Sequence, residues 1–307
     1  MPRAIAVHGG AGNIPESLRP EHNEGIRLAR EAGRRVLLEG GSALDAVIAA
    51  VIVLEDLPAF NAGYGAVLNA EGYIELDAGL MDGSTLDIGA VAAVQGIRNP
   101  ILLCRYVLTG PHILFAKEDA ARLAAAAGIE QVDPRSLITP RRLEQWLAGQ
   151  RSLRVDSGAP SSPLSAQGET HPPADTVGAV ALDAAGNLAA ATSTGGINGK
   201  APGRIGDSPL PGGGFYADNL VGACSTTGWG ESLARTLTAR RAIEGLERGL
   251  TPAQAARAAI DLLGQRIAGG EGGLILLDRH GRFGAAFNSQ RMTHAWWSEV
   301  DGEGVVA

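Results

Sequence analysis

The chain of 307 residues is poor in aromatic side chains and in cysteine. Aromatic residues make up 4% of it, although 45% of the residues are hydrophobic. Such a core must be built from Ala, Val, Leu and Ile, and the 43 glycines would let its layers approach closely. Its two cysteines, Cys104 and Cys224, are too few for a disulfide framework. We expect both to be small buried residues of a protein in a reducing, cytoplasmic setting.

The chain also lacks the usual features of proteins that bind nucleic acids, membranes, zinc or nucleotides. Its net charge is −7 and its longest basic clusters are arginine pairs, whereas binding a phosphate backbone needs a basic face. No apolar run reaches the roughly 18 residues of a transmembrane helix, and the first residues lack a signal-peptide core. The six histidines have no metal-ligand spacing, and the glycine run at 8–12 matches neither nucleotide motif. We therefore expect neither a nucleic-acid nor a membrane partner.

Hydrophobic patterning predicts strands and helices that come in clusters rather than in strict alternation. This order favours an α+β layered sandwich over a doubly wound parallel sheet. Ser42 and Thr251 are predicted helix caps, each followed by a helical pattern. The predicted helices are 21–39, 42 to about 54, 112–127, 140–148, 230–248 and 251–267, and the predicted strands are 4–7, 73–76, 86–94, 176–182, 188–193, 220–225, 273–277 and 283–287.

Thr176 is the candidate nucleophile. A segment rich in Ser, Pro and Gly, about residues 149–175, predicts a flexible linker, and Thr176 follows it at the start of a predicted strand. A threonine hydroxyl is a weak nucleophile that needs a base. A cut before Thr176 would free its own α-amine beside the hydroxyl, and an amine with a pKa of roughly 8 is partly neutral near pH 7. The alternative is that Thr176 is an ordinary residue of a strand. The predicted linker directly before it argues against that alternative.

Six ordered motifs carry a resemblance that extends from His8 to about Gly284. They are HGGAG at 8–12, FNAGYG at 60–65, MDG at 81–83, TVGAVALD at 176–183, ATSTGG at 191–196 and PGRIGDSP at 202–209. With these motifs the sequence resembles the isoaspartyl peptidase/plant-type asparaginase family of N-terminal-nucleophile hydrolases. The resemblance implies a four-layer αββα sandwich, α+β in class, forming one domain over residues 1–307.

The resemblance further implies a precursor that cleaves itself between Asp175 and Thr176. The products would be an α subunit, residues 1–175, and a β subunit, residues 176–307, which begins with the nucleophile. Asp175 stands where many asparaginase-type members carry glycine. Thr194 would tune the nucleophile's hydroxyl. Thr227 and Gly228 would form the oxyanion hole from a hydroxyl and a backbone N–H.

The substrate-binding residues also follow from the resemblance. Arg204 would clasp the substrate's α-carboxylate through its guanidinium fork, and Asp207 would take the α-ammonium group. Gly228 and Gly230 would line this site, and Asn61 would position the substrate or a water molecule. A surface ion pair between Arg204 and Asp207 is the alternative interpretation of their spacing.

The loop at 54–64 resembles the cation-stabilised loop of the family. The resemblance implies a structural sodium or potassium ion, no organic cofactor, and a dimer of αβ heterodimers. The ion would be held by the backbone carbonyls of Leu54, Glu55, Leu57, Phe60, Ala62 and Tyr64.

The implied activity is that of an amidohydrolase acting on a small aspartyl substrate. It would cleave β-aspartyl (isoaspartyl) dipeptides, L-asparagine or both through an acyl-enzyme on the freed Thr176. Glycosylasparaginase activity and a catalytically silent relative are the alternatives. The candidate substrates share one zwitterionic aspartyl end and differ in the leaving group, which the sequence does not specify.

Overall fold

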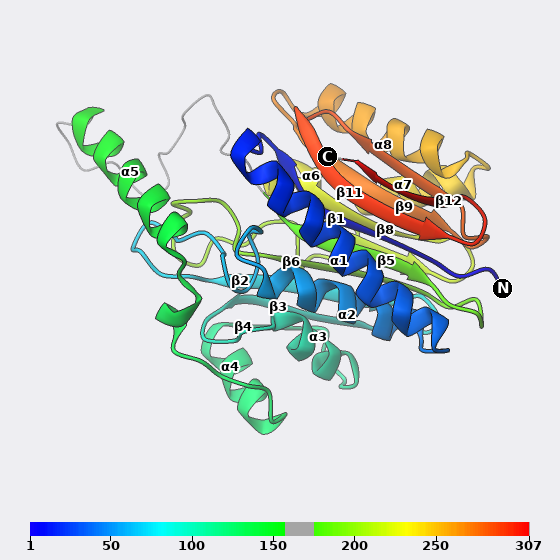
Figure 1. Cartoon of the computed structure of the whole chain (residues 1–307), viewed down its shortest axis with the longest axis horizontal. Coiled ribbons are helices and arrows are strands. Elements are labelled where there is room, and N and C mark those ends of the chain that lie inside the picture. The colour runs from blue at the N-terminus through cyan, green and yellow to red at the C-terminus, as the bar shows by residue number, and fades with distance from the viewer. Residues whose placement is uncertain (157–174, 307) are drawn as a thin grey trace.

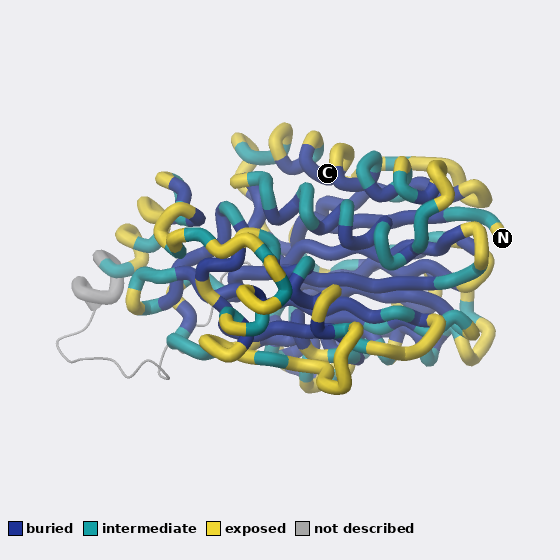
Figure 2. The backbone as a smooth tube through the Cα atoms, turned by 90° about the horizontal axis from the view of Figure 1, so that it is seen from below, coloured by how far each residue is buried: buried dark blue, intermediate teal, exposed yellow. Residues whose placement is uncertain are grey.

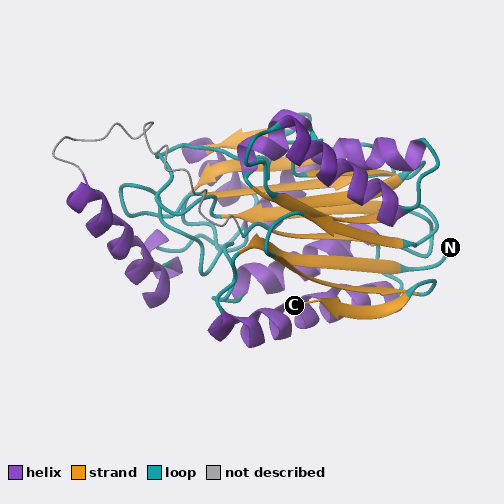
Figure 3. Ribbon diagram, turned by 90° about the horizontal axis from the view of Figure 1, so that it is seen from above, coloured by secondary structure: helices purple, strands orange, loops and turns teal. Residues whose placement is uncertain are grey.

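Two stacked β-sheets form the centre of the fold, and helices cover their outer faces (Figures 1 and 3). The computed structural model of the chain describes residues 1–156 and 175–306. In spatial order, the larger sheet contains β12 (Gly302–Val306), β11 (Arg291–Ser298), β1 (Ala4–Gly12), β5 (Val177–Leu182), β6 (Leu188–Thr194), β2 (Leu76–Asp82), β3 (Ile88–Val94) and β4 (Leu114–Ala116). The smaller contains β10 (Phe283–Phe287), β9 (Gly272–Asp278), β8 (Gly222–Gly228) and β7 (Phe215–Asp218).

The helices form the two outer layers. The larger sheet is covered by α1 (Arg19–Leu38), α2 (Ala43–Asp56) and α3 (Pro100–Leu108), and the smaller sheet by α7 (Thr238–Glu247) and α8 (Pro252–Arg266). The expected four-layer αββα sandwich is therefore confirmed. The other helices are α4 (Lys117–Ala126), α5 (Pro140–Asp156) and α6 (Gly230–Thr236), with single 3₁₀ turns at Glu16–Leu18 and Pro134–Leu137.

Small side chains let these layers pack closely, as the composition predicted. Three apolar clusters fill the spaces between the layers, and they consist mainly of Ala, Val, Leu and Ile. Figure 2 shows the buried strands between exposed outer helix surfaces. A Cβ on Gly79 of β2 would overlap the ring of Phe215 in β7, so the two sheets approach over a glycine. Cys104 and Cys224 are buried and free, as expected.

Local signals located several elements correctly. Ser42 caps α2 by accepting a hydrogen bond from the Asp45 N–H, and Thr251 and Gln254 form a complete capping box on α8. The predicted strands 273–277 and 283–287 are also present, and they pair with each other as the hairpin of β9 and β10. None of the helices within the described ranges is long and apolar enough to cross a membrane.

Other predictions were wrong where tertiary contacts decide the structure. The predicted strand 4–7 ended too early, because residues 8–12 continue β1: Ala11 and Gly12 pair with β11 beyond an irregularity in register. The predicted helix 230–248 is two helices, separated at Leu237, whose φ is 51°. The predicted strand 73–76 begins at Leu76 as β2. Strands β4, β7, β11 and β12 and helix α3 were not predicted.

The predicted linker at 149–175 begins too early, because α5 continues to Asp156. The rest of that segment, residues 157–174, lies outside the described residues. The structure therefore places the helix boundary after the predicted one.

Gly89→Ala should destabilise the fold. A Cβ on Gly89 of β3 would overlap the carbonyl oxygen of Cys104 in α3, and a helix backbone cannot move aside as a side chain can. We expect a loss of about 1–3 kcal/mol in the free energy of unfolding, measured with urea. Gly149→Ala in α5 is the control, because the nearest atom to its Cβ would be Asn198 Nδ2 at 4.0 Å. Alanine there should add up to about 1 kcal/mol through helix propensity; similar effects of the two variants would contradict this packing.

Candidate active site

Thr176 lies at one end of the sandwich, the end at which β5 begins and β6 and β8 finish. It immediately precedes β5, and the β5–β6 register pairs Val177 with Ser193, which brings Thr176 beside Thr194 at the end of β6. In the other sheet, β8 packs over β5 and β6 and ends at Gly228. Figure 3 shows loops gathered at this end, opposite the chain's N-terminus. This end of the sandwich therefore brings together chain segments that are far apart in the sequence.

The hydroxyl of Thr176 is buried and faces a second hydroxyl. Its Oγ1 lies 3.2 Å from Oγ of Ser208, and Thr176 is 3% exposed. The carbonyl of Ser208 accepts a hydrogen bond of 2.6 Å from Thr192 Oγ1, which fixes the 208 segment on β6. Ser208 had no predicted role, although it follows Asp207 directly in a quoted motif. A hydroxyl at that position was the available signal.

Asp175, on the other side of the predicted cleavage bond, packs against β1. A Cβ on Gly10 would lie 2.7 Å from Asp175 Cα, and Gly10 has a φ of +113°, so glycine is required there. Oδ1 of Asp175 is buried and has no hydrogen-bond partner among the described residues. Burial raises the pKa of Asp175 to about 6, although the positive charges of Arg142 and Arg141 lower it.

His8 of β1 lies opposite Gly178 of β5 and turns its ring toward Ser225. Its Nε2 is 2.8 Å from Oγ of Ser225, which itself donates to the carbonyl of Ala191 at 3.1 Å. Burial lowers the pKa of His8 to about 3, so the ring is neutral. A Cβ on Gly178 would lie 2.5 Å from His8 Nε2. The ring and its glycine neighbour therefore fill the space between the sheets.

The predicted oxyanion residues end β8. Oγ1 of Thr227 accepts a hydrogen bond of 3.2 Å from the Ala11 N–H, which ties β8 to β1 of the other sheet. Gly228 has a φ of +138°, and a Cβ there would lie 2.5 Å from the carbonyl oxygen of Glu271. Trp229 then donates its N–H to the same carbonyl at 2.8 Å. Only glycine therefore fits at 228, where β8 packs directly on the backbone of residues 271 and 272.

Arg204 and Asp207 converge on Gly230 without pairing with each other. Arg204 donates from Nε and Nη2 to the two carboxylate oxygens of Glu231, at 2.8 and 2.7 Å. Oδ2 of Asp207 accepts from Thr226 Oγ1 at 3.0 Å. A Cβ on Gly230 would lie 2.9 Å from Arg204 Nη2 and 3.0 Å from Asp207 Oδ1. Without a side chain at 230, a cation and an acid can both approach the same backbone position, and these are the two charges that the ends of an amino-acid zwitterion require.

Glu231, which the sequence interpretation did not assign, holds the guanidinium of Arg204. It lies in the first turn of α6 directly after Gly230, and 43% of its side chain is exposed, against 16% for Arg204. Hydrogen bonding to Arg204 keeps the pKa of Glu231 below its usual value despite partial burial. The surface ion pair between Arg204 and Asp207, considered as an alternative, is not present. An acid next to Gly230 was the only sequence signal for this partner.

Asn61 holds the turn that follows Thr194. Its Nδ2 donates to the carbonyl of Gly196 at 2.7 Å, and its Oδ1 accepts from the Val67 N–H at 2.9 Å. Oγ1 of Thr194 accepts from the N–H of Gly196 at 3.0 Å. These contacts make Asn61 a support of the 194–196 turn, and a direct role on substrate or water stays a prediction.

The predicted cation loop closes through its own backbone. The carbonyl of Glu55 accepts from the Tyr64 N–H at 2.7 Å, and that of Leu57 accepts from the Phe60 N–H at 3.2 Å. Each carbonyl retains a second lone pair. Burial raises the pKa of the Glu55 carboxyl to about 8, so this acid adds little negative charge at neutral pH. The described residues contain no group of three or more His, Cys, Asp or Glu that could hold a metal.

A buried threonine at the start of a central strand in an αββα sandwich defines the class of N-terminal-nucleophile hydrolases. The family model described as Asparaginase matches residues 1–306, so the chain belongs to the asparaginase family.

Its relatives match over nearly their whole length. The isoaspartyl peptidase/L-asparaginase of Xenopus laevis is 44% identical over 296 residues, which are 96% of this chain and 92% of the relative. The human protein of the same name is 43% identical over 301 residues, 97% and 94% of the two chains. The isoaspartyl peptidase of Salmonella typhimurium is 45% identical over 304 residues, 95% and 94% of the two chains.

Asp207→Asn should stabilise the fold at pH 8 and not at pH 4. Burial raises the pKa of Asp207 to about 7 from 3.8, although the hydrogen bond from Thr226 and the charge of Arg204 oppose this. The ionised carboxylate therefore costs stability progressively as pH rises from about 4 to 7, and asparagine removes that cost. We expect a gain of about 2–4 kcal/mol at pH 8, measured by urea unfolding of unprocessed chains carrying Thr176→Ala. An equal gain at pH 4 would contradict this origin.

Proposed function

We propose that this protein is an amidohydrolase that cleaves β-aspartyl dipeptides, L-asparagine or both, using Thr176 as the nucleophile. The observation that carries the proposal is that Arg204 and Asp207 both approach Gly230, while Oγ of Ser208, the residue after Asp207, lies 3.2 Å from the buried Thr176 hydroxyl. An aspartyl substrate has an α-carboxylate and an α-ammonium group on one carbon, which match this pair of opposite charges. The names of the relatives point to the same substrates.

Maturation would use the same hydroxyl as turnover. Oγ1 of Thr176 would attack the carbonyl carbon of Asp175, and the peptide nitrogen would leave as the new α-amine, giving an ester between the two residues. Water would then hydrolyse the ester, freeing the carboxylate of Asp175 and the hydroxyl of Thr176. The close packing of Asp175 on Gly10 holds the carbonyl side of this bond in place.

In turnover the freed α-amine would act as the base. It would take the proton of Oγ1 while Oγ1 attacks the substrate's side-chain carbonyl, and it would return the proton to the leaving nitrogen. The hydroxyl of Thr227 and the N–H of Gly228 would stabilise the negative oxygen of the intermediate. Water would release aspartate from the acyl-enzyme.

The alternatives differ in the leaving group or in the absence of turnover. A glycosylasparaginase would bind the same aspartyl end and release a glycosylamine. A silent relative would keep the fold without hydrolysing any of these substrates. Assays of L-asparagine, a β-aspartyl dipeptide and a glycosylated asparagine side by side separate the three.

We further propose that a sodium or potassium ion stabilises the loop at 54–64. A hard cation would take oxygen ligands from the carbonyls named above, and those of Glu55 and Leu57 already accept hydrogen bonds from N–H groups of the same loop. Such an ion would fix the segment that carries Asn61. A dimer of αβ units in the cytoplasm completes the proposal; the buried, unpaired state of Cys104 and Cys224 agrees with a reducing compartment.

Thr176→Ala should yield a single folded chain without activity. The variant lacks the hydroxyl that both steps need, whereas the buried surroundings of residue 176 accept the smaller side chain. Denaturing electrophoresis should show wild type as fragments 1–175 and 176–307 and the variant as one band. A variant that still splits at this bond would refute the assignment of the nucleophile.

Arg204→Ala should mature normally and lose recognition of the substrate. The cleavage-site peptide offers no free α-carboxylate, so the arginine is not needed for the cut. We expect kcat/KM for a β-aspartyl dipeptide to fall at least about a hundredfold, or about 3 kcal/mol. Arg204→Lys should recover only part, because an ammonium lacks the planar fork.

The decisive comparison for Arg204 uses a substrate whose α-carboxylate is amidated. Wild type should discriminate strongly against it, and Arg204→Ala should not. Equal discrimination by both enzymes would show that Arg204 does not hold the carboxylate.

A further inference from the structure

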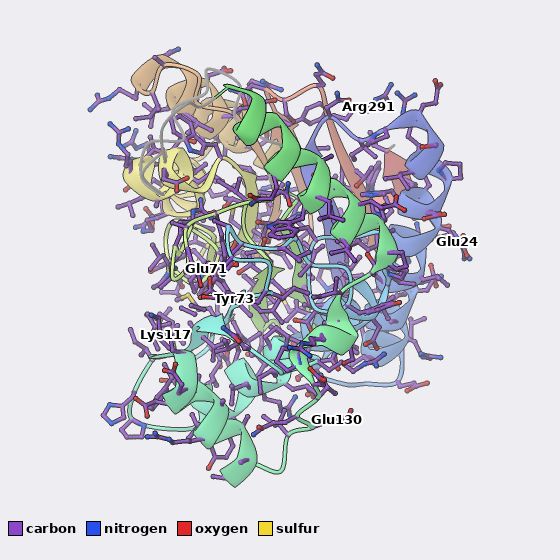
Figure 4. All side chains as sticks on the ribbon, turned by 90° about the vertical axis from the view of Figure 1, so that its left-hand side faces the viewer. Glu24, Glu71, Tyr73, Lys117, Glu130 and Arg291 are labelled. Atoms are coloured by element: carbon purple, nitrogen blue, oxygen red, sulfur yellow. The ribbon has the colours of Figure 1, made fainter. Side chains whose placement is uncertain are left out.

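Lysine is rare in this chain, and both of its lysines lie beside the loop at 202–209, which carries the predicted substrate-binding residues Arg204 and Asp207. Among 26 basic residues, Lys117 and Lys200 are the lysines and all others are arginines. Lys117 is exposed at the start of α4, on the end of the molecule that Figure 4 faces, with Nζ 3.4 Å from the position of a Cβ on Gly203. Lys200 is 5% exposed. A compact ammonium group is therefore buried in a chain that otherwise relies on guanidinium groups.

Lys200 is anchored on β2 and on the residue just before it. Its Nζ donates to the carbonyl of Glu75 at 3.1 Å and lies 3.8 Å from Oδ2 of Asp77, with both charged side chains almost fully buried. Oδ1 of Asp77 accepts from the Ala93 N–H at 2.7 Å, and Oδ2 has no hydrogen-bond partner among the residues described. The ammonium is thus the counter-ion of a carboxylate that cannot reach water.

The ion pair of Lys200 and Asp77 lies near the candidate nucleophile, at the same end of the sandwich. The β2–β6 register pairs Asp77 with Thr194, the residue beside the nucleophile. The Gly203 N–H donates to the Glu75 carboxylate at 2.9 Å, and the Lys200 carbonyl accepts from the Ala70 N–H at 2.8 Å, so both ends of the 200–203 segment are held. Replacing a buried ion pair by apolar groups often costs no stability. Stability alone therefore does not explain why the pair is present.

Lys200 and Arg204 converge on Gly196. A Cβ on Gly196 would lie 3.1 Å from Lys200 Nζ and 3.4 Å from Arg204 Nη1. Two cations that approach one another in a buried site repel, and Arg204 also belongs to the predicted carboxylate clamp. An anion bound at Arg204 would relieve this repulsion, so the pair of cations favours the bound state.

We propose that Lys200, held by Asp77, is a positioning residue that supplies a second positive charge behind Arg204 for the substrate's α-carboxylate. This inference rests on the proposed function, because the carboxylate is that of the aspartyl substrate. Lys200 acts through Gly196 and Arg204 and does not touch the reacting atoms. Its effect is therefore on substrate binding and not on the chemical step.

Lys200→Met tests the charge, with Lys117→Met as the matched control at the other lysine. In processed Lys200→Met enzyme, KM for a β-aspartyl dipeptide should rise at least about tenfold, kcat should stay within about threefold, and discrimination against the α-amidated substrate should shrink. Lys117→Met should match wild type in all three. Unchanged KM and discrimination in Lys200→Met would overturn the proposal.

The double variant Lys200→Met/Asp77→Asn separates charge from packing. Lys200→Met alone leaves Asp77 buried and unpaired, so its melting temperature should fall or the chain should fail to fold. The double variant removes both charges and should recover the melting temperature while KM stays raised. Recovery of KM together with stability would show a packing role only and refute the proposal.

Wild-type enzyme offers a direct readout, since a chain labelled with ¹³C-lysine has only two lysines to assign. Addition of L-aspartate, the product, should shift the ε-CH₂ signals of Lys200 and leave those of Lys117 in place. Aspartate that binds by calorimetry without shifting Lys200 would overturn the inference. A wild type that neither binds aspartate nor hydrolyses the dipeptide would instead refute the proposed function.

Discussion

The antiparallel pairing of β5 with both β1 and β6 is the constraint on which the site depends. It fixes Thr176 at the end of a strand that is paired on both sides, so the candidate nucleophile has a defined position without being part of a helix or a long loop. The same pairing brings Thr194 next to Thr176 and places His8 opposite Gly178, and β8 packs over β5 from the other sheet. The groups that we assign to the chemistry lie around the end of the sandwich at which β5 begins.

The site also requires glycine at two positions. There the charged side chains come close to the backbone and leave no room for a Cβ. Gly196 separates Lys200 from Arg204, and Gly230 separates Arg204 from Asp207. Each of these charges has its own partner within the described residues, which limits the cost of burying it. The glycine-rich composition therefore serves both the close approach of the layers and the arrangement of the site.

The sequence predicted the features that depend on local signals and missed those that depend on distant partners. The caps at Ser42 and Thr251 and the strands at 188–193 and 273–277 follow from patterns a few residues long. The extension of β1 requires β11, which lies at the other end of the chain. Glu231 as the partner of Arg204 follows from how α6 sits against the 202–209 loop, and no spacing rule contains that information. The motif at 202–209, which carries Arg204 and Asp207, does lie close to Thr176, because Oγ of Ser208 is 3.2 Å from the Thr176 hydroxyl.

The order of strands has a consequence for the processed protein. In the larger sheet, β1 from the segment before Thr176 lies between β11 and β5 from the segment after it, and β6 lies beside β2. The two cleavage products would therefore be interleaved in one hydrogen-bonded sheet and would not come apart as separate globules. Only the uncut chain would fold as a unimolecular reaction; once cut, refolding would become second order in protein. The cleaved enzyme would therefore depend on kinetic stability: it would stay folded because it unfolds slowly, and not because its separated fragments refold readily.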